Sequence, residues 1–302
     1  MGGLHMKMAK VAMMQMYVKT NDPETNLLHA AKLLDELCET EKPDFVLYPE
    51  TCDVGWASAE AEEYAGTVPG GAACEAFREM AVKHQVYLVA GLTEKDGSRI
   101  FNTAVFFSPE GELLAKHRKI NVLQDVEGIY EIGDRVQVVE TSFGRVGLDI
   151  CADNFESSTV FLHVMGRMGA RMVLSPCAWA VVPDFDISTT PCNEMWRQSY
   201  SRMSQLYRMP VIGVSNVGAL ESGPWKDHKA IGNSMAYGTD GKQIIELPFG
   251  VDEEITKVIE VKLAEEIAKG TDFAGALLRR GYFGLAEEIL KAPEAHGDGS
   301  VV

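Results

Sequence analysis

The sequence has few basic residues for its length: 28 lysines and arginines stand against 44 acidic residues in a chain of 302. The net charge of −16 argues against binding to a nucleic-acid backbone, which requires a basic surface. Long hydrophobic runs are also missing, because the apolar stretch 11–18 is too short to span a membrane and lacks a cleavage site. We therefore expect neither nucleic acid nor a membrane as a partner.

The six cysteines lack the spacing of a disulfide framework or of a metal site. No two of them form a Cys-x-x-Cys pair, and none lies beside a histidine at the spacing of metal ligands. A chain of this length and apolar content can bury a core without cross-links. We therefore expect reduced thiols, a cytoplasmic location and no bound metal.

Apolar runs and helical patterns alternate along the chain and predict an α/β fold. The predicted strands are 11–18, 45–48, 86–92, 102–107, 136–139, 146–150, 172–174, 211–217, 234–237, 243–247 and 255–261. The predicted helices are 22–39, which opens with Asp22-Pro23, and 71–84, 155–168 and 193–207. Turn residues at 108–112 and 238–242 predict hairpins, which favour mixed sheets over a pure βαβ repeat.

The domain organisation is expected to be simple, because the sequence contains no linker, low-complexity run or short-period repeat. We expect one domain over residues 7–302. Residues 1–6 (MGGLHM) are interpreted as a cloning remnant, and the tail 292–302, rich in glycine and alanine, is expected to fray.

Cys151 is the most informative residue, because it ends a predicted strand and precedes a turn into a predicted helix. A thiol that faces a helix N-terminus lies in positive potential, which favours the nucleophilic thiolate. A nucleophile between a strand and a helix is a recurrent catalytic arrangement. A small buried cysteine without a chemical role is the alternative interpretation.

Two further charged residues are candidates, one after a predicted strand and one after a predicted hairpin. Glu50 comes directly after the strand 45–48, at the rim of the sheet where sites form in α/β folds. A solvated loop glutamate is the alternative. Lys119 lies in the basic stretch 114–122 after a predicted hairpin, and the alternative is an ordinary charged edge of a sheet.

Taken in order, these segments resemble the three signatures of the nitrilase (carbon–nitrogen hydrolase) superfamily. The matching segments are Pro49-Glu50, Arg118-Lys119, and Ile150-Cys151 followed by Asp153 and Phe155-Glu156. The resemblance covers about residues 11–261. It implies a single-domain, four-layer αββα sandwich, an assembly of at least a homodimer, and catalytic roles for Glu50, Lys119 and Cys151. Glu127, eight residues after Lys119, matches a second glutamate in the site of this family.

The chain departs from the family pattern near the cysteine. Phe155 is followed directly by Glu156, without the proline that often separates them, and Ala152 stands where nitrile-specific members typically carry tryptophan. The resemblance therefore favours an amide substrate over a nitrile. A nitrilase or N-carbamoyl hydrolase is the second interpretation, and a catalytically silent α/β scaffold is the third. The intact Glu50, Lys119 and Cys151 argue against the scaffold.

The implied reaction is hydrolysis of a non-peptide C–N bond in a small amide. Cys151 would attack the carbonyl carbon and form a thioester, while Glu50 would take the thiol proton, pass it to the leaving ammonia or amine and then activate water. Lys119 and the N–H of Ala152 would stabilise the oxyanion. Glu127 would orient Lys119 or the substrate amide. This chemistry requires no metal or organic cofactor.

The substrate pocket is less readable from the sequence. Trp179, in the segment 175–179 that follows a predicted strand, and Tyr130 are candidate apolar walls, although both could be ordinary core aromatics. Asp153 is expected to cap the next helix, with Glu156 completing a capping box. The apolar stretch 273–278 could cross to a partner subunit.

Overall fold

The apolar strands pair into two six-stranded mixed sheets in the computed structural model, which describes residues 7–264. The first sheet has the order β15-β1-β2-β3-β4-β5. Its strands are β1 (Lys7–Gln15), β2 (Phe45–Leu47), β3 (Tyr87–Asp96), β4 (Arg99–Phe107), β5 (Leu113–Arg118) and β15 (Ile255–Leu263).

The second sheet has the order β14-β13-β10-β8-β7-β6. Its strands are β6 (Gln137–Thr141), β7 (Gly144–Leu148), β8 (Met172–Cys177), β10 (Val211–Ser215), β13 (Met235–Tyr237) and β14 (Gln243–Glu246). Three short strands, β9 (Ala180–Val181), β11 (Val217–Ala219) and β12 (Lys229–Ile231), form a small third sheet. The antiparallel pairs β4–β5 and β13–β14 confirm the predicted hairpins.

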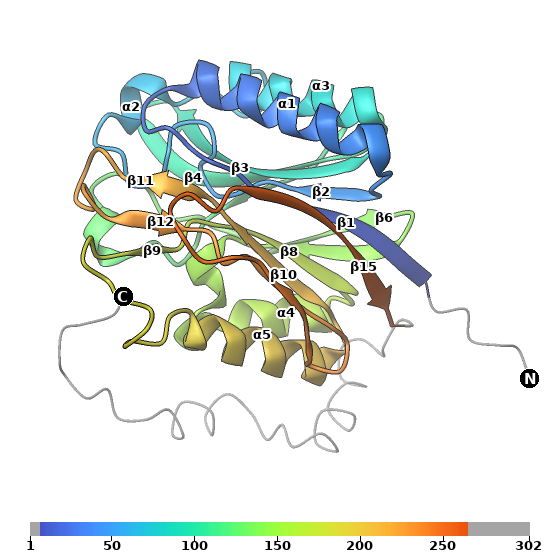
Figure 1. Cartoon of the computed structure of the whole chain (residues 1–302). Coiled ribbons are helices and arrows are strands. Elements are labelled where there is room, and N and C mark those ends of the chain that lie inside the picture. The colour runs from blue at the N-terminus through green and yellow to red at the C-terminus, as the bar shows by residue number, and fades with distance from the viewer. Residues whose placement is uncertain (1–6, 265–302) are drawn as a thin grey trace, which may run out of the picture.

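Helices cover the outer face of each large sheet (Figure 1). The first sheet is covered by α1 (Pro23–Thr40) and α3 (Ala72–His84), and the second by α4 (Val160–Arg167) and α5 (Glu194–Tyr207). A single turn, α2 (Ala61–Tyr64), lies beyond the end of the first sheet. The layer order of helix, sheet, sheet and helix confirms the predicted αββα sandwich.

Strand β1 shows why its sequence is apolar on both faces. Val11 and Met13 pack in the core shared with the second sheet, whereas Ala12 and Met14 pack in the core beneath α1 and α3. Because successive side chains of a strand point to opposite faces, a strand covered on both sides reads as a continuous apolar run.

The capping predictions have different outcomes at two helices. At α1, Pro23 occupies the first turn and the Asp22 carboxylate accepts a hydrogen bond from the Thr25 N–H at 3.2 Å, as predicted. The predicted helix 155–168 is shorter: two 3₁₀ turns, η2 (Cys151–Asn154) and η3 (Glu156–Ser158), precede α4. Asp153 does not cap α4, whose N-cap is Thr159. That prediction was wrong because the Asp153 carboxylate is engaged elsewhere.

Three sequence expectations concern residues outside the described range: the remnant 1–6, the apolar stretch 273–278 and the tail 292–302. Within residues 7–264, none of the helices combines the length and apolar character needed to cross a bilayer.

Candidate active site

Glu50 and Lys119 meet beyond the ends of strands in the first sheet. Glu50 follows β2 and Lys119 follows β5, and the Lys119 Nζ donates to the Glu50 Oε1 at 2.6 Å. The Asn102 amide, on β4, donates to the same oxygen at 2.5 Å. Neither charged side chain is more than 2% exposed, so the pair is fully buried. Gly91 makes room for it, since a Cβ there would lie 2.5 Å from the Glu50 Cα.

Strand β5 was not among the predicted strands, although the predicted hairpin required a partner for β4. It is the edge strand of the first sheet, in agreement with the alternative interpretation of its basic residues. Lys119 nevertheless lies just past the strand and is buried. An edge strand therefore delivers a charged side chain into the interior.

Cys151 approaches this pair from the second sheet, directly after β7 and Ile150. Its backbone has a φ of +44°, a left-handed conformation that non-glycine residues adopt infrequently and at some energetic cost. The Cys151 N–H donates to the Ser175 Oγ at 3.2 Å. Cys151, Ala152 and Lys119 line one cavity, so the two sheets jointly supply its reactive groups.

The protonation states at the site differ from the thiolate expected from sequence. Burial raises the pKa of the Cys151 thiol well above its usual value, the neighbouring Cys177 and Glu50 raise it further, and Lys119 offsets only part of this. Burial alone would lower the pKa of Lys119, but the acidic groups around it, Glu50 foremost, together outweigh burial and the net shift is upward. Cys151 begins a four-residue 3₁₀ turn, so a helix dipole does not compensate. These directions favour a neutral thiol beside an ammonium group.

A base is required to ionise such a thiol, and Glu50 has an oxygen available. Its Oε2 is buried and has no hydrogen-bond partner among residues 7–264. A buried carboxylate oxygen without a partner is costly, so its presence beside a cysteine suggests a chemical use.

Asp153 holds the cysteine turn against the Lys119 segment. Its carboxylate accepts hydrogen bonds from the backbone N–H groups of Ile120 (3.1 Å), Asn121 (2.7 Å) and Ile150 (3.1 Å), and from the His117 Nε2 at 2.8 Å. The Asn121 amide also donates to the Ala152 carbonyl at 2.7 Å. These contacts fix the position of Cys151 relative to Lys119, a role that the sequence did not reveal.

Asp149 is a second buried carboxyl beside the turn. Burial raises its pKa to about 7, while the Ser175 hydroxyl lowers it. The Asn154 amide donates to its Oδ1 at 2.8 Å, and its Oδ2 has no partner among the described residues. The unpartnered oxygen is where a proton would reside.

Replacing Asp149 with asparagine should flatten the pH dependence of stability. The folded pKa lies above the usual value of 3.8, so between about pH 4 and pH 7 the native state holds a proton that the unfolded chain releases. The free energy of unfolding therefore falls as pH rises through this window, by up to about 1 kcal/mol per pH unit. Urea unfolding at several pH values would measure the slope. The exposed Asp252→Asn is the matched control, and an unchanged slope in Asp149→Asn would reject the assignment.

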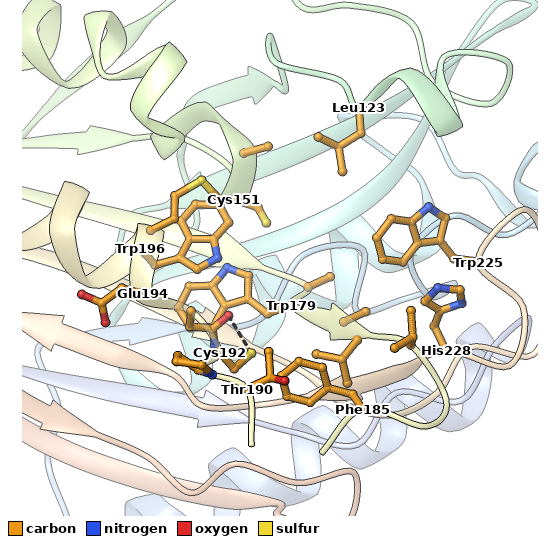
Figure 2. Close-up of a pocket in the computed structure, with 18 of the residues that line it drawn as sticks. Leu123, Cys151, Trp179, Phe185, Thr190, Cys192, Glu194, Trp196, Trp225 and His228 are labelled. Atoms are coloured by element: carbon orange, nitrogen blue, oxygen red, sulfur yellow. Dashed lines mark hydrogen bonds between the residues drawn. The ribbon is translucent and has the colours of Figure 1, made fainter. Parts of the chain in front are cut away.

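The cavity above Cys151 has a volume of about 670 Å³ (Figure 2). Tryptophans dominate its wall, because all four in the chain, Trp56, Trp179, Trp196 and Trp225, line it. The rings of Trp179 and Trp196 stack with centroids 5.3 Å apart, and Trp56 and Trp225 meet edge to face at 5.0 Å. The loop 182–193 between β9 and α5 forms much of the rim.

Of the three predicted pocket residues, two line the cavity in the structure and one does not. Trp179 and Ala152 line the cavity. Tyr130 does not: it is buried among the residues behind Trp56, and its hydroxyl accepts a hydrogen bond from the Ala57 N–H at 3.2 Å. Tyr130 was therefore misassigned as a wall, because its role is to support the Trp56 segment.

Glu127 is not brought to the site. It follows the 3₁₀ turn η1 (Gln124–Val126), which turns Val126 into the core and leaves Glu127 exposed. The expected contact with Lys119 is therefore absent from the described structure, where Glu50 is the acidic partner of Lys119. The spacing of eight residues from Lys119 does not show which side chains of the 3₁₀ turn point into the protein.

Asn102, Trp56 and Trp196 also belong to the site and were missed, whereas Ser175, in the segment 175–179, and Trp225, a weaker candidate, were named from the sequence. The sequence did hold a signal for Asn102, because a polar amide stands at the start of an otherwise apolar predicted strand. The structure shows that this amide is buried. Across residues 7–264, no cluster of three or more His, Cys, Asp or Glu side chains is arranged to hold a metal ion.

Comparison with known proteins agrees with this architecture. The family model for carbon–nitrogen hydrolases matches residues 10–269. A nitrilase from Pyrococcus abyssi is 34% identical over 56% of this chain, and an omega-amidase from Xenopus tropicalis is 29% identical over 60% of it. The alignments span 64% and 66% of these relatives, just under two thirds of each.

Solved structures share the fold at low sequence identity. Nit3 from Saccharomyces cerevisiae has a TM-score of 0.72 at 23% identity, with 85% of this chain and 90% of that chain covered. A carbon–nitrogen hydrolase from Helicobacter pylori has a TM-score of 0.74 at 20% identity, with 95% and 99% covered. The match to the family model extends over most of the sequence. The chain therefore belongs to the carbon–nitrogen hydrolase family, as the three short motifs predicted.

Proposed function

We propose that this protein hydrolyses the C–N bond of an amide through a thioester on Cys151. The observation that carries the proposal is the buried Glu50–Lys119 pair, whose lysine lines one cavity together with the buried Cys151. Two opposite charges and a nucleophile satisfy the needs of acyl transfer: a base, an oxyanion partner and an attacking atom.

In the first half-reaction, the free Oε2 of Glu50 takes the Cys151 proton as the sulfur attacks the carbonyl carbon. The Lys119 ammonium and the Ala152 N–H stabilise the oxyanion of the tetrahedral intermediate. The C–N bond then breaks, and the leaving nitrogen receives the proton from Glu50. The products are free ammonia or amine and a Cys151 thioester.

In the second half-reaction, Glu50 takes a proton from water as the water oxygen attacks the thioester carbon. The C–S bond breaks, the carboxylic acid leaves, and Glu50 returns the proton to the Cys151 sulfur. Cys151 and Glu50 thus end in their starting states, and the net change is one water consumed per C–N bond cleaved.

Cellular context forms a second part of the proposal. We infer a homodimer in the cytoplasm: all six cysteines are free thiols, which suits a reducing compartment. Val164 on α4 and Met168, which caps its C-terminus, are each 38% exposed, and apolar side chains of this size are suited to a subunit interface. Sedimentation would test the assembly.

The reaction is tested by ammonia release from aliphatic amides, aryl-substituted amides, nitriles and N-carbamoyl amino acids. We expect release from amides and loss of release in Cys151→Ala. Release from nitriles alone would point instead to a nitrilase, the activity named for the Pyrococcus relative. Silence across the panel, with a Cys151 that does not react with iodoacetamide, would reject the hydrolase.

A further inference from the structure

Aromatic side chains line two sides of the cavity that contains Cys151. Figure 2 shows Trp179 and Trp196 on one side, and Trp225 with His228 on the other, with the Cys151 side chain between them. His228 packs against Trp225 with ring centroids 4.7 Å apart. A lining that carries aromatic side chains on two sides favours an aromatic ring as its occupant.

The cavity is also larger than a simple aliphatic amide requires. Its volume of about 670 Å³ is that of a site for a ligand of moderate size. A two- or three-carbon amide would fill only a small part of this volume. Filling the cavity therefore needs a bulky substituent on the acyl carbon.

The charges around the cavity select against an anionic substituent. Among its lining residues, Lys119 is the only lysine or arginine, and its ammonium is already bound to Glu50. The other charged groups on the rim are acidic: Asp184, Asp186 and Glu194. A carboxylate on the substrate would be desolvated beside tryptophans without a cation to pair with, which is strongly unfavourable.

Two indole N–H groups offer neutral recognition instead. The Nε1 atoms of Trp56 and Trp179 are buried and have no acceptor among residues 7–264. A buried donor without an acceptor costs free energy, and a neutral ether, hydroxyl or carbonyl oxygen on a ligand could satisfy it. Unlike an arginine, an indole donor supplies no charge to balance a carboxylate.

We propose that the acyl group of the substrate is a bulky, uncharged aromatic group, such as an arylalkanoic amide. This inference rests on the proposed amidase function and specifies its substrate class. A matched pair of substrates tests it: 3-(4-methylphenyl)propanamide and 3-(4-carboxyphenyl)propanamide differ only in a methyl or carboxylate of similar size. We expect kcat/KM to be at least about tenfold higher for the methyl compound, and higher for it than for propanamide.

A charge reversal at the rim gives an independent test. Asp184 is exposed and contributes no hydrogen bond or ion pair to the described fold, so Asp184→Lys should not disturb folding. It should raise the ratio of carboxylate to methyl kcat/KM about fivefold, since it supplies the missing cation. The matched control is Asp252→Lys, an exposed reversal outside the cavity, which should leave the ratio unchanged.

Truncation of Trp225, which lines the cavity, should reduce the preference for the aromatic substrate over propanamide. Trp225→Ala should lower kcat/KM for the methyl compound about tenfold or more, mainly through KM, and affect propanamide much less. Trp225→Phe should retain most of the wild-type kcat/KM for the methyl compound. This variant separates the loss of an aromatic contact with the substrate from a general folding defect.

The two proposals fail in different ways. Cys151-dependent hydrolysis in which the carboxylate compound or propanamide is the better substrate would overturn the aromatic assignment and leave the amidase intact. Absence of ammonia release from every amide, together with unreactive Cys151, would reject the proposed function itself.

Discussion

Turnover should disappear when Cys151 is replaced with alanine, while the protein still folds. The substitution removes the attacking sulfur, and water would have to attack the amide directly without forming a thioester. We expect kcat to fall by about 10⁴-fold or more, as in other enzymes that lose a nucleophile. The side chain is small and its N–H contact to Ser175 is made by the backbone, so the turn should persist. Ammonia release and a circular-dichroism melt would measure the two effects.

The control for this variant is Cys74→Ala. Cys74 is equally small and buried, but it lies on α3 in the core beneath the outer helices. Both variants lose a buried sulfur, and only one loses the proposed nucleophile. Turnover near the wild-type rate in Cys151→Ala, or an equal loss in Cys74→Ala, would contradict the assignment.

Breaking the Glu50–Lys119 pair should cost both rate and stability, and only stability should be recoverable. Either Glu50→Gln or Lys119→Met leaves an uncompensated buried charge, which typically destabilises a protein by about 3–5 kcal/mol. The double variant removes both charges, so its free energy of unfolding should return most of the way to the wild type. Turnover should remain at least about 100-fold reduced in all three variants, because the base or the oxyanion partner is missing.

A double-mutant cycle of urea unfolding and steady-state rates measures this coupling. The comparison pair is Lys32 and Glu36 on α1, whose charged groups are 3.6 Å apart and largely exposed. Removing one member of that pair should cost less than about 0.5 kcal/mol. A Glu50/Lys119 double variant that regains its rate along with its stability would show that the pair is structural.

Local signals in the sequence predicted the strands and the mixed α/β sheets well, and the family resemblance supplied the four-layer sandwich. Each predicted strand has a counterpart in the structure, because periodicity reports burial of faces and most strands here are covered on both sides. Glu50 and Cys151 could be found because each closely follows a predicted strand, and strand ends fix where a chain enters a site, whereas Lys119 stood out in the basic stretch after a predicted hairpin. Their order along the sequence then matched a known family.

The remainder of the site depends on contacts between distant segments. Trp56 and Trp225 are far apart in the sequence and meet only because the loops after β2 and β11 fold together. Asp153 looked like a helix cap because the same carboxylate can accept N–H groups from its own helix or from the Lys119 segment. Spacing alone could not place Glu127 for a related reason: the direction of a side chain after a 3₁₀ turn is set by tertiary packing.

The reactive groups are divided between the two sheets, and the Glu50 N–H donates across this division to the Cys177 carbonyl at 3.1 Å. The distance between base and nucleophile is therefore a property of how one sheet lies on the other. Displacements of about 1 Å can cost an enzyme roughly 100-fold in rate. The catalytic rate should consequently be sensitive to small changes in the relative position of the two sheets. A substitution in the core between the sheets should therefore lower the rate at a perturbation too small to unfold the chain.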